Sequence, residues 1–113
     1  MKKSYRIKSS QDFQRIIDKK ENFANKKFVI YQAEGQKDHF RAGISVSKKL
    51  GNAVARNRIK RLIRESLHEF SQGLQDVDFI VIARAGVEKL DFEQVKSNLL
   101  HALKNSKIYI EKD

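Results

Sequence analysis

The segment SVSKKLGNAVARNRIKRLIR, residues 45–64, connects the end of an expected β-strand to the start of an expected helix. It holds seven cations and no acid; the cations are Lys48, Lys49, Arg56, Arg58, Lys60, Arg61 and Arg64. The acid-free stretch begins at His39. Like charges at this density repel one another and destabilise a compact fold unless an anion lies against them. The segment therefore predicts a surface that faces a polyanion, for which a phosphate backbone is the best match.

The composition of the whole chain agrees with this prediction. The 113 residues carry a formal net charge of +10, and 40% of them are hydrophobic. We expect a single domain over residues 1–113, whose charge indicates RNA, DNA or an anionic membrane surface as partner. Because there is no cysteine, disulfide scaffolds and thiolate zinc sites are excluded. No apolar run approaches the roughly 18 residues that cross a bilayer, and the basic start lacks an apolar signal region, so we expect a cytoplasmic protein. Of the three kinds of partner, we expect a nucleic acid and not a membrane.

Helical spacing and capping residues predict three helices: residues 10–20, residues 53–71, and a last helix from Asp91 onward. Ser9 or Ser10 is suited to cap the first helix, Asn52 the second and Asp91 the third. Gln94 completes a pair with Asp91 that resembles a capping box.

Three segments have the composition of β-strands: residues 27–33, 40–47 and 77–83. The loop 34–38 would join the first two as a hairpin, and the third, VDFIVIA, is apolar enough to be central or covered on both faces. A short extra strand near residues 23–25 is compatible with the pattern, and residues 107–113 fit either a frayed end or a short edge strand. The order α-β-β-(β)-α-β-α predicts an α+β fold, an α/β sandwich of three helices on a mainly antiparallel sheet of about four strands.

The central helix separates apolar from basic residues. Its expected buried face consists of Ala55, Ile59, Leu62, Ile63, Leu67 and Phe70. The opposite face consists of Asn57, Lys60, Arg61, Arg64 and His68, with Arg56 and Arg58 flanking it near the helix start. Cations at a helix N-terminus oppose the helix dipole, at a cost of about 0.3–1 kcal/mol each, whereas an anion is favoured there. This placement favours a phosphate-binding surface.

A solvated basic face is the alternative interpretation of such a helix. Two observations argue against it. Acids that could form intrahelical pairs begin only at Glu65, and the neighbouring strand region adds Arg41, Lys48 and Lys49 to the same area. A helix-turn-helix is not favoured, because the basic helix follows a strand and not a short helix.

No catalytic site is apparent in the chain itself. A metal-dependent nuclease needs convergent carboxylates, but the 14 acids are dispersed. Acid–base catalysis would need paired histidines, and His39, His68 and His101 belong to separate expected elements. These patterns indicate an RNA-binding protein without an active site of its own.

The basic block contains a specific motif. It comprises residues 48–54 (KKLGNAV), Arg56-Asn57-Arg58-Ile59-Lys60-Arg61, and Arg64. Arg6, the pair Asp12-Phe13, and the strings FVIY, RAGISVS and FIVIAR accompany it along the chain. In these features, residues 1–107 resemble the protein subunit of bacterial ribonuclease P.

The resemblance implies a fold and an activity. The fold includes a left-handed βαβ crossover, an exception to the usual handedness, formed here by residues 40–47, 53–71 and 77–83. The enzyme removes the 5′ leader of precursor tRNA, with catalysis in its RNA subunit and bound Mg²⁺. The protein binds that RNA and the leader, which makes ribonuclease P RNA and precursor tRNA the implied partners of a chain we expect to be monomeric alone. A ribosomal or other structural RNA-binding protein is the alternative.

The resemblance also implies two sets of binding residues. Those facing the RNA subunit are Arg56, Asn57, Arg58, Lys60, Arg61, Arg64, Lys48, Lys49 and Asn52. Those at or beside the leader cleft are Phe13, Ile17, Tyr31, Arg41, Ser45 and Ser47. Ile17 departs from the family, in which an aromatic residue is common at this position. For Phe13, packing in the core is an equally good explanation. No catalytic or metal-binding residue is implied in the chain.

Overall fold

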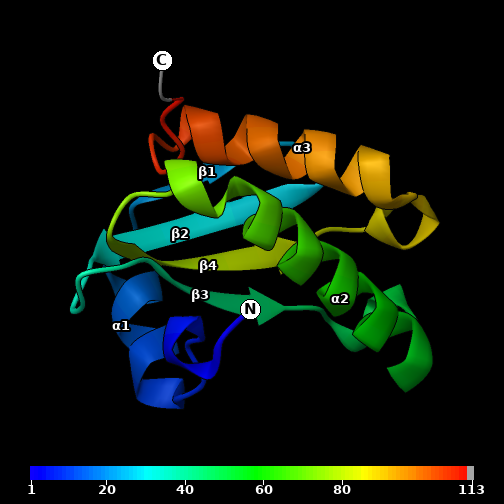
Figure 1. Cartoon of the computed structure of the whole chain (residues 1–113). Coiled ribbons are helices and arrows are strands. Elements are labelled where there is room, and N and C mark those ends of the chain that lie inside the picture. The colour runs from blue at the N-terminus through cyan, green and yellow to red at the C-terminus, as the bar shows by residue number, and fades with distance from the viewer. Residues whose placement is uncertain (112–113) are drawn as a thin grey trace.

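The computed structural model, which describes residues 1–111, has a four-stranded sheet with helices on both faces (Figure 1). The main elements are α1 (Ser10–Asp18), β1 (Asn22–Ala24), β2 (Phe28–Glu34), β3 (Arg41–Ser45), α2 (Ala53–Phe70), β4 (Val77–Ala83) and α3 (Phe92–Asn105). Short 3₁₀ turns are η1 (Lys3–Tyr5), η2 (Lys48–Leu50), η3 (Ser71–Gly73) and η4 (Val87–Lys89). The strand order is β1-β2-β4-β3, in which only β3 and β4 are parallel. The predicted α+β class and mainly antiparallel sheet are confirmed.

The predicted hairpin between the second and third strands is wrong. β4 lies between β2 and β3, pairing antiparallel with β2 and parallel with β3. The apolar sequence of β4 explains this order, because a central strand is covered on both faces. Gly35 shows where the connecting chain runs, since a Cβ at this position would clash with the backbone oxygen of Asp76. The loop therefore packs against the start of β4, and β3, α2 and β4 form a parallel β–α–β unit.

The sheet separates two hydrophobic clusters of unequal size. The larger one lies under α2 and α3 and includes Phe28, Ile30, Phe79 and Val81 of the sheet. The smaller one lies under α1 and has only four buried members: Ile7, Ile16, Ala33 and Ile80. In Figure 1, α2 and α3 cover one face, and α1 lies at one end of the other. The larger part of the core therefore lies under α2 and α3, and only the smaller part lies under α1.

The helices begin where the capping residues predicted. Ser9 Oγ accepts the backbone N–H of Asp12 at 3.0 Å, and Asn52 Oδ1 accepts that of Ala55 at 2.9 Å. Asp91 and Gln94 form a complete capping box. Of the apolar face predicted for α2, Ile59, Ile63, Leu67 and Phe70 are buried, while Ala55 and Leu62 are half-buried. Local sequence therefore set both the start and the orientation of α2.

The two ends of the described chain pack beside the sheet and α2. The N-terminal segment runs along β3, where the Ile7 N–H donates to the Ala42 carbonyl at 3.0 Å. Near the other end, Tyr109 forms a single bridge with Leu74, so residues 107–111 do not form a strand. Residues 112–113, which the prediction for the C-terminal end also included, lie outside the described residues.

Candidate nucleic-acid interface

The predicted cationic residues gather on the outer side of α2 and in the turn before it. Lys48 and Lys49 are exposed in η2, and Ser47 shapes that turn because its Oγ accepts the Lys49 N–H at 3.0 Å. Asn52 then caps α2. The chain leaves β3, makes one tight turn and enters the helix, which places both lysines beside the cations of its first turns.

Two arginines at the start of α2 are oriented by backbone carbonyls. Arg56 Nε donates to the Gly51 oxygen at 3.2 Å, and Arg58 Nη2 donates to the Leu90 oxygen at 3.0 Å. These contacts fix the side chains without neutralising them. Every ion pair within residues 1–111 involves Arg15, Arg41, Lys96 or Lys104 as the cation. Within that range, none of the seven cations in residues 45–64 is therefore paired with a carboxylate.

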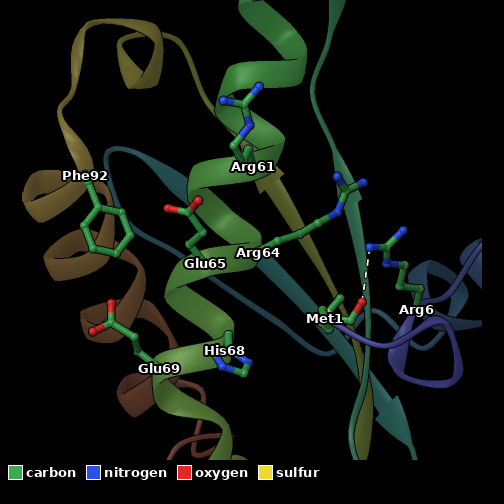
Figure 2. Close-up of a pocket in the computed structure, with 8 residues that line it drawn as sticks. All are labelled: Met1, Arg6, Arg61, Arg64, Glu65, His68, Glu69 and Phe92. Atoms are coloured by element: carbon green, nitrogen blue, oxygen red, sulfur yellow. Dashed lines mark hydrogen bonds between the residues drawn. The ribbon is translucent and has the colours of Figure 1, made fainter.

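Farther along α2, Arg64 lies next to Arg6 of the N-terminal segment. Figure 2 shows the two guanidinium groups beside each other, and Arg6 Nη2 donates to the Met1 carbonyl at 3.1 Å. The Nε atoms of both arginines are buried without a hydrogen-bond partner. They belong to a shallow hollow of about 590 Å³ that Met1, Arg6, Arg61, Arg64, Glu65, His68, Glu69 and Phe92 line.

The electrostatics of this hollow favour an anion. Burial lowers the pKa of Arg64 from its usual value, and the nearby charge of Arg6 lowers it further. In Figure 2, Glu65 and Glu69 point toward Phe92 on the α3 side and away from the arginine pair. Arg6 and Lys8 were not among the predicted binding residues. The string Arg6-Ile7-Lys8 could have indicated them, because two cations flank an apolar residue that anchors the segment beside β3.

The predicted leader residues gather on the α1 side of the sheet. Phe13, Ile17 and Tyr31 pack, half-buried, against the smaller cluster. Tyr31 therefore faces away from Phe28 and Ile30, which belong to the larger cluster. Phe13 packs directly over Gly43, where a Cβ would lie only 2.6 Å from its Cζ.

Beyond α1, this face of the sheet continues as a half-exposed strip. The strand register places Ile82 between Val29 on β2 and Ser45 on β3. Val29 and Ile82 are half-buried and Ser45 is exposed. Ser47 is exposed as well, but its hydroxyl accepts the hydrogen bond that shapes η2. The strip is therefore an accessible apolar surface that ends beside the cationic turn.

Arg41, also predicted to be in the leader cleft, is held by carboxylates. Its Nε and Nη2 donate to the two oxygens of Asp78, at 3.1 and 2.7 Å. The hydrogen bond to Asp78 raises the pKa of Arg41, and the charges of Asp78 and Asp12 add to the effect. Asp78 was missed in the sequence, where the only signal was a single acid inside the apolar strand VDFIVIA.

The three histidines remain on separate elements. His39 stacks on Tyr5 with ring centroids 4.0 Å apart, His68 lines the arginine hollow, and His101 Nδ1 lies 3.2 Å from Asn25 Nδ2. Across residues 1–111, no three His, Asp or Glu side chains converge as metal ligands. In the same residues, no helix combines the length and the apolar character needed to cross a membrane.

Cations along one helix that have no carboxylate partner among residues 1–111, next to a half-exposed apolar sheet face, are typical of a small α+β nucleic-acid-binding protein. The family model described as Ribonuclease P matches residues 1–107 of this chain. The chain belongs to the ribonuclease P protein family; it is a protein subunit of that tRNA-processing enzyme, in which its partner is an RNA.

Relatives and solved structures agree with this assignment. The ribonuclease P protein component of Lactococcus lactis subsp. lactis is 59% identical over 111 residues, which cover 98% of this chain and 95% of that protein. The ribonuclease P protein component of Streptococcus gordonii is 60% identical over 111 residues, which cover 98% of this chain and 93% of that protein. The solved Staphylococcus aureus RNase P protein has a TM-score of 0.90 at 48% identity and covers 96% of this chain and 100% of its own. A solved Thermotoga maritima RNase P protein has a TM-score of 0.82 at 30% identity and covers 93% of this chain and 99% of its own.

Proposed function

We propose that this chain acts as a single RNA-binding domain with two adjoining surfaces. One binds the ribonuclease P RNA, and the other binds the single-stranded 5′ leader of precursor tRNA. By holding both, the protein assists endonucleolytic removal of the leader, which leaves the mature tRNA 5′ end. The observation that carries the proposal is the set of seven cations, none paired with a carboxylate of residues 1–111, directly beside a half-exposed apolar sheet face.

The surface for the RNA subunit consists of Lys48, Lys49, Asn52, Arg56, Asn57, Arg58, Lys60, Arg61 and Arg64. Its support is electrostatic. Cations that have no acidic partner among the described residues can replace the counterions of a phosphate backbone, and release of those counterions drives binding. The N–H groups at the start of α2 add a second preference for phosphate. Arg6 and Lys8 extend the same positive region along β3.

The leader surface consists of Phe13, Ile17, Tyr31, Ser45 and Ser47. Aromatic rings give single-stranded bases a stacking platform that tolerates any sequence, and nearby cations hold the phosphates. Phe13 and Tyr31 are the two rings that this surface offers. Ile17 provides an aliphatic contact in place of a third ring. Arg41 contributes indirectly, because Asp78 occupies its guanidinium.

In this proposal, the RNA subunit carries out the cleavage. Among residues 1–111, no three His, Asp or Glu side chains gather as candidate ligands of a metal ion. We assign Mg²⁺ to the RNA subunit and the substrate and no catalytic residue to this chain. We further propose that the free protein is a cytoplasmic monomer.

Reconstitution tests the proposal. The purified protein is incubated with a bacterial ribonuclease P RNA and a precursor tRNA at low Mg²⁺, with each component alone as a control. We expect cleavage at the mature 5′ end only when the RNA and the protein are both present. Cleavage by the protein alone would mean that it has an active site of its own. Tight RNA binding without stimulation would instead indicate a structural RNA-binding role.

A further inference from the structure

Asp78 is a completely buried carboxylate on the α1 face of the sheet. Its oxygens accept three hydrogen bonds from two arginines. Arg41 of β3 donates two, and Arg15 Nη2 of α1 donates one at 2.5 Å. A buried carboxylate is tolerated only when it is paired and hydrogen-bonded in this way. Asp78 therefore joins the sheet to α1.

The ion cluster is neutral. Asp12 of α1 lies 3.5 Å from Arg15 and 3.8 Å from Arg41, so two carboxylates face two guanidinium groups. Arg15 Nη1 also donates to the Glu34 carbonyl at the end of β2. The side chains of Arg15 and Arg41 are only 28% and 12% exposed, so little of either is available to a ligand. The cluster binds α1 to three strands and contributes no free charge.

The apolar core under α1 is small beside the one under α2. The helix has nine residues, of which only Ile16 is buried. Its own packing joins the smaller cluster, which has four buried members. Nonetheless α1 carries Phe13 and Ile17, and the Phe13 ring lies so close over Gly43 that no side chain would fit between them. The position of both side chains over the sheet therefore depends strongly on the ion cluster.

We propose that Asp78 is a positioning residue for leader binding: it holds α1 at the angle that places Phe13 and Ile17 beside Tyr31. This inference rests on the proposed function of the α1 face in binding the leader. It separates Asp78 from the RNA-subunit surface, because α2 is held by the larger cluster on the opposite face. Loss of the carboxylate loosens α1 and leaves the outer side of α2 in place.

The test compares holoenzymes made with wild-type protein, Asp78→Asn, Arg15→Met and the control Asp38→Asn. Asp78→Asn keeps the shape of the side chain and removes its charge, and Arg15→Met removes the guanidinium from α1. Asp38 is exposed in the loop before β3 and takes part in no ion pair of residues 1–111, so its substitution makes the same charge change outside the ion cluster. Two affinities are measured: that of each protein for the RNA subunit, and that of each holoenzyme for precursor tRNA with a long or a one-nucleotide leader.

We expect Asp78→Asn to reduce the affinity gained from the long leader by about five- to tenfold, the equivalent of one weak stacking contact. Arg15→Met should have the same effect in smaller measure, and Asp38→Asn none. Affinity for the RNA subunit should stay within about twofold of wild type, because Coulombic contacts on α2 are unchanged. Hydrogen exchange should accelerate at the α1 amides and not at those of α2.

The possible outcomes separate the two proposals. If the wild-type holoenzyme gains no affinity from a long leader, the proposed leader surface fails. If wild type gains affinity and both variants retain the gain in full, the role of Asp78 is overturned. A parallel loss of affinity for the RNA subunit would also overturn it, since that result indicates general destabilisation. If Asp78→Asn does not fold, Arg15→Met decides by the same criteria.

Discussion

Gly43 offers the sharpest test of how α1 and the sheet form a surface. We consider Gly43→Ala. The new Cβ would lie 2.6 Å from Phe13 Cζ, 3.0 Å from Cε2 and 3.3 Å from Cε1. Non-bonded carbon atoms pack at about 3.5–4.0 Å, so the ring must withdraw by roughly 1 Å. The φ angle of Gly43 is not positive, and the backbone itself therefore accepts alanine.

The expected effect on stability is small. Overpacking costs about 1–3 kcal/mol, but loss of glycine entropy in the unfolded chain returns about 0.4–1 kcal/mol. We expect the free energy of unfolding to fall by about 0–2.6 kcal/mol as a result. Displacement of the Phe13 ring, which we propose stacks on a leader base, should cost more in the free energy of leader binding. Loss of one base–aromatic stack is worth about 1–3 kcal/mol, or about five- to 150-fold in Kd.

The assay is the affinity of the holoenzyme for precursor tRNA with a long or a one-nucleotide leader, in a double-mutant cycle with Phe13→Ala. Gly43→Ala should weaken binding of the long-leader substrate in the wild-type background and have little effect once Phe13 is absent. Gly73→Ala is the matched control, because its Cβ would meet the Tyr109 ring at 2.5 Å, away from α1. Equal losses with and without Phe13 would refute the reasoning.

Three further predictions concern α2, α3 and the fold as a whole. Arg61→Ala should reduce the salt dependence of binding to the RNA subunit by about 0.7–0.9 in the slope of log K against log salt; an unchanged slope, like that expected for exposed Lys37→Ala, would place Arg61 off the RNA. Asp91→Ala removes the capping box of α3 and should cost about 1 kcal/mol, a fall in Tm of about 4–8 °C by circular dichroism, with RNA binding unaffected. Sulfate should raise Tm relative to chloride at matched ionic strength, because an anion that binds the native state stabilises it, and equal values of Tm would argue against an anion site.

Local sequence determined where the main helices begin, which face of α2 is buried and where β4 lies. The start of each main helix follows from a cap within three residues of the N–H group that it satisfies. The buried face of α2 follows from helical periodicity, and β4 spans the predicted residues 77–83. The extra strand near residues 23–25 is β1. The motif in residues 48–64 was sufficient to identify the family, because its unusual charge density and spacing are properties of the chain itself.

Interactions between distant segments decided the rest. The hairpin prediction failed because neighbouring strands in the sequence need not pair, and burial of β4 on both faces favoured its central position between β2 and β3. Arg41 looked like a free cation because its partner, Asp78, is 37 residues away. The sequence by itself determined which residues are helical, which are basic and to which family they belong. Only the tertiary structure decided which cations are neutralised and which remain free to meet a phosphate, since pairing depends on distances that folding sets.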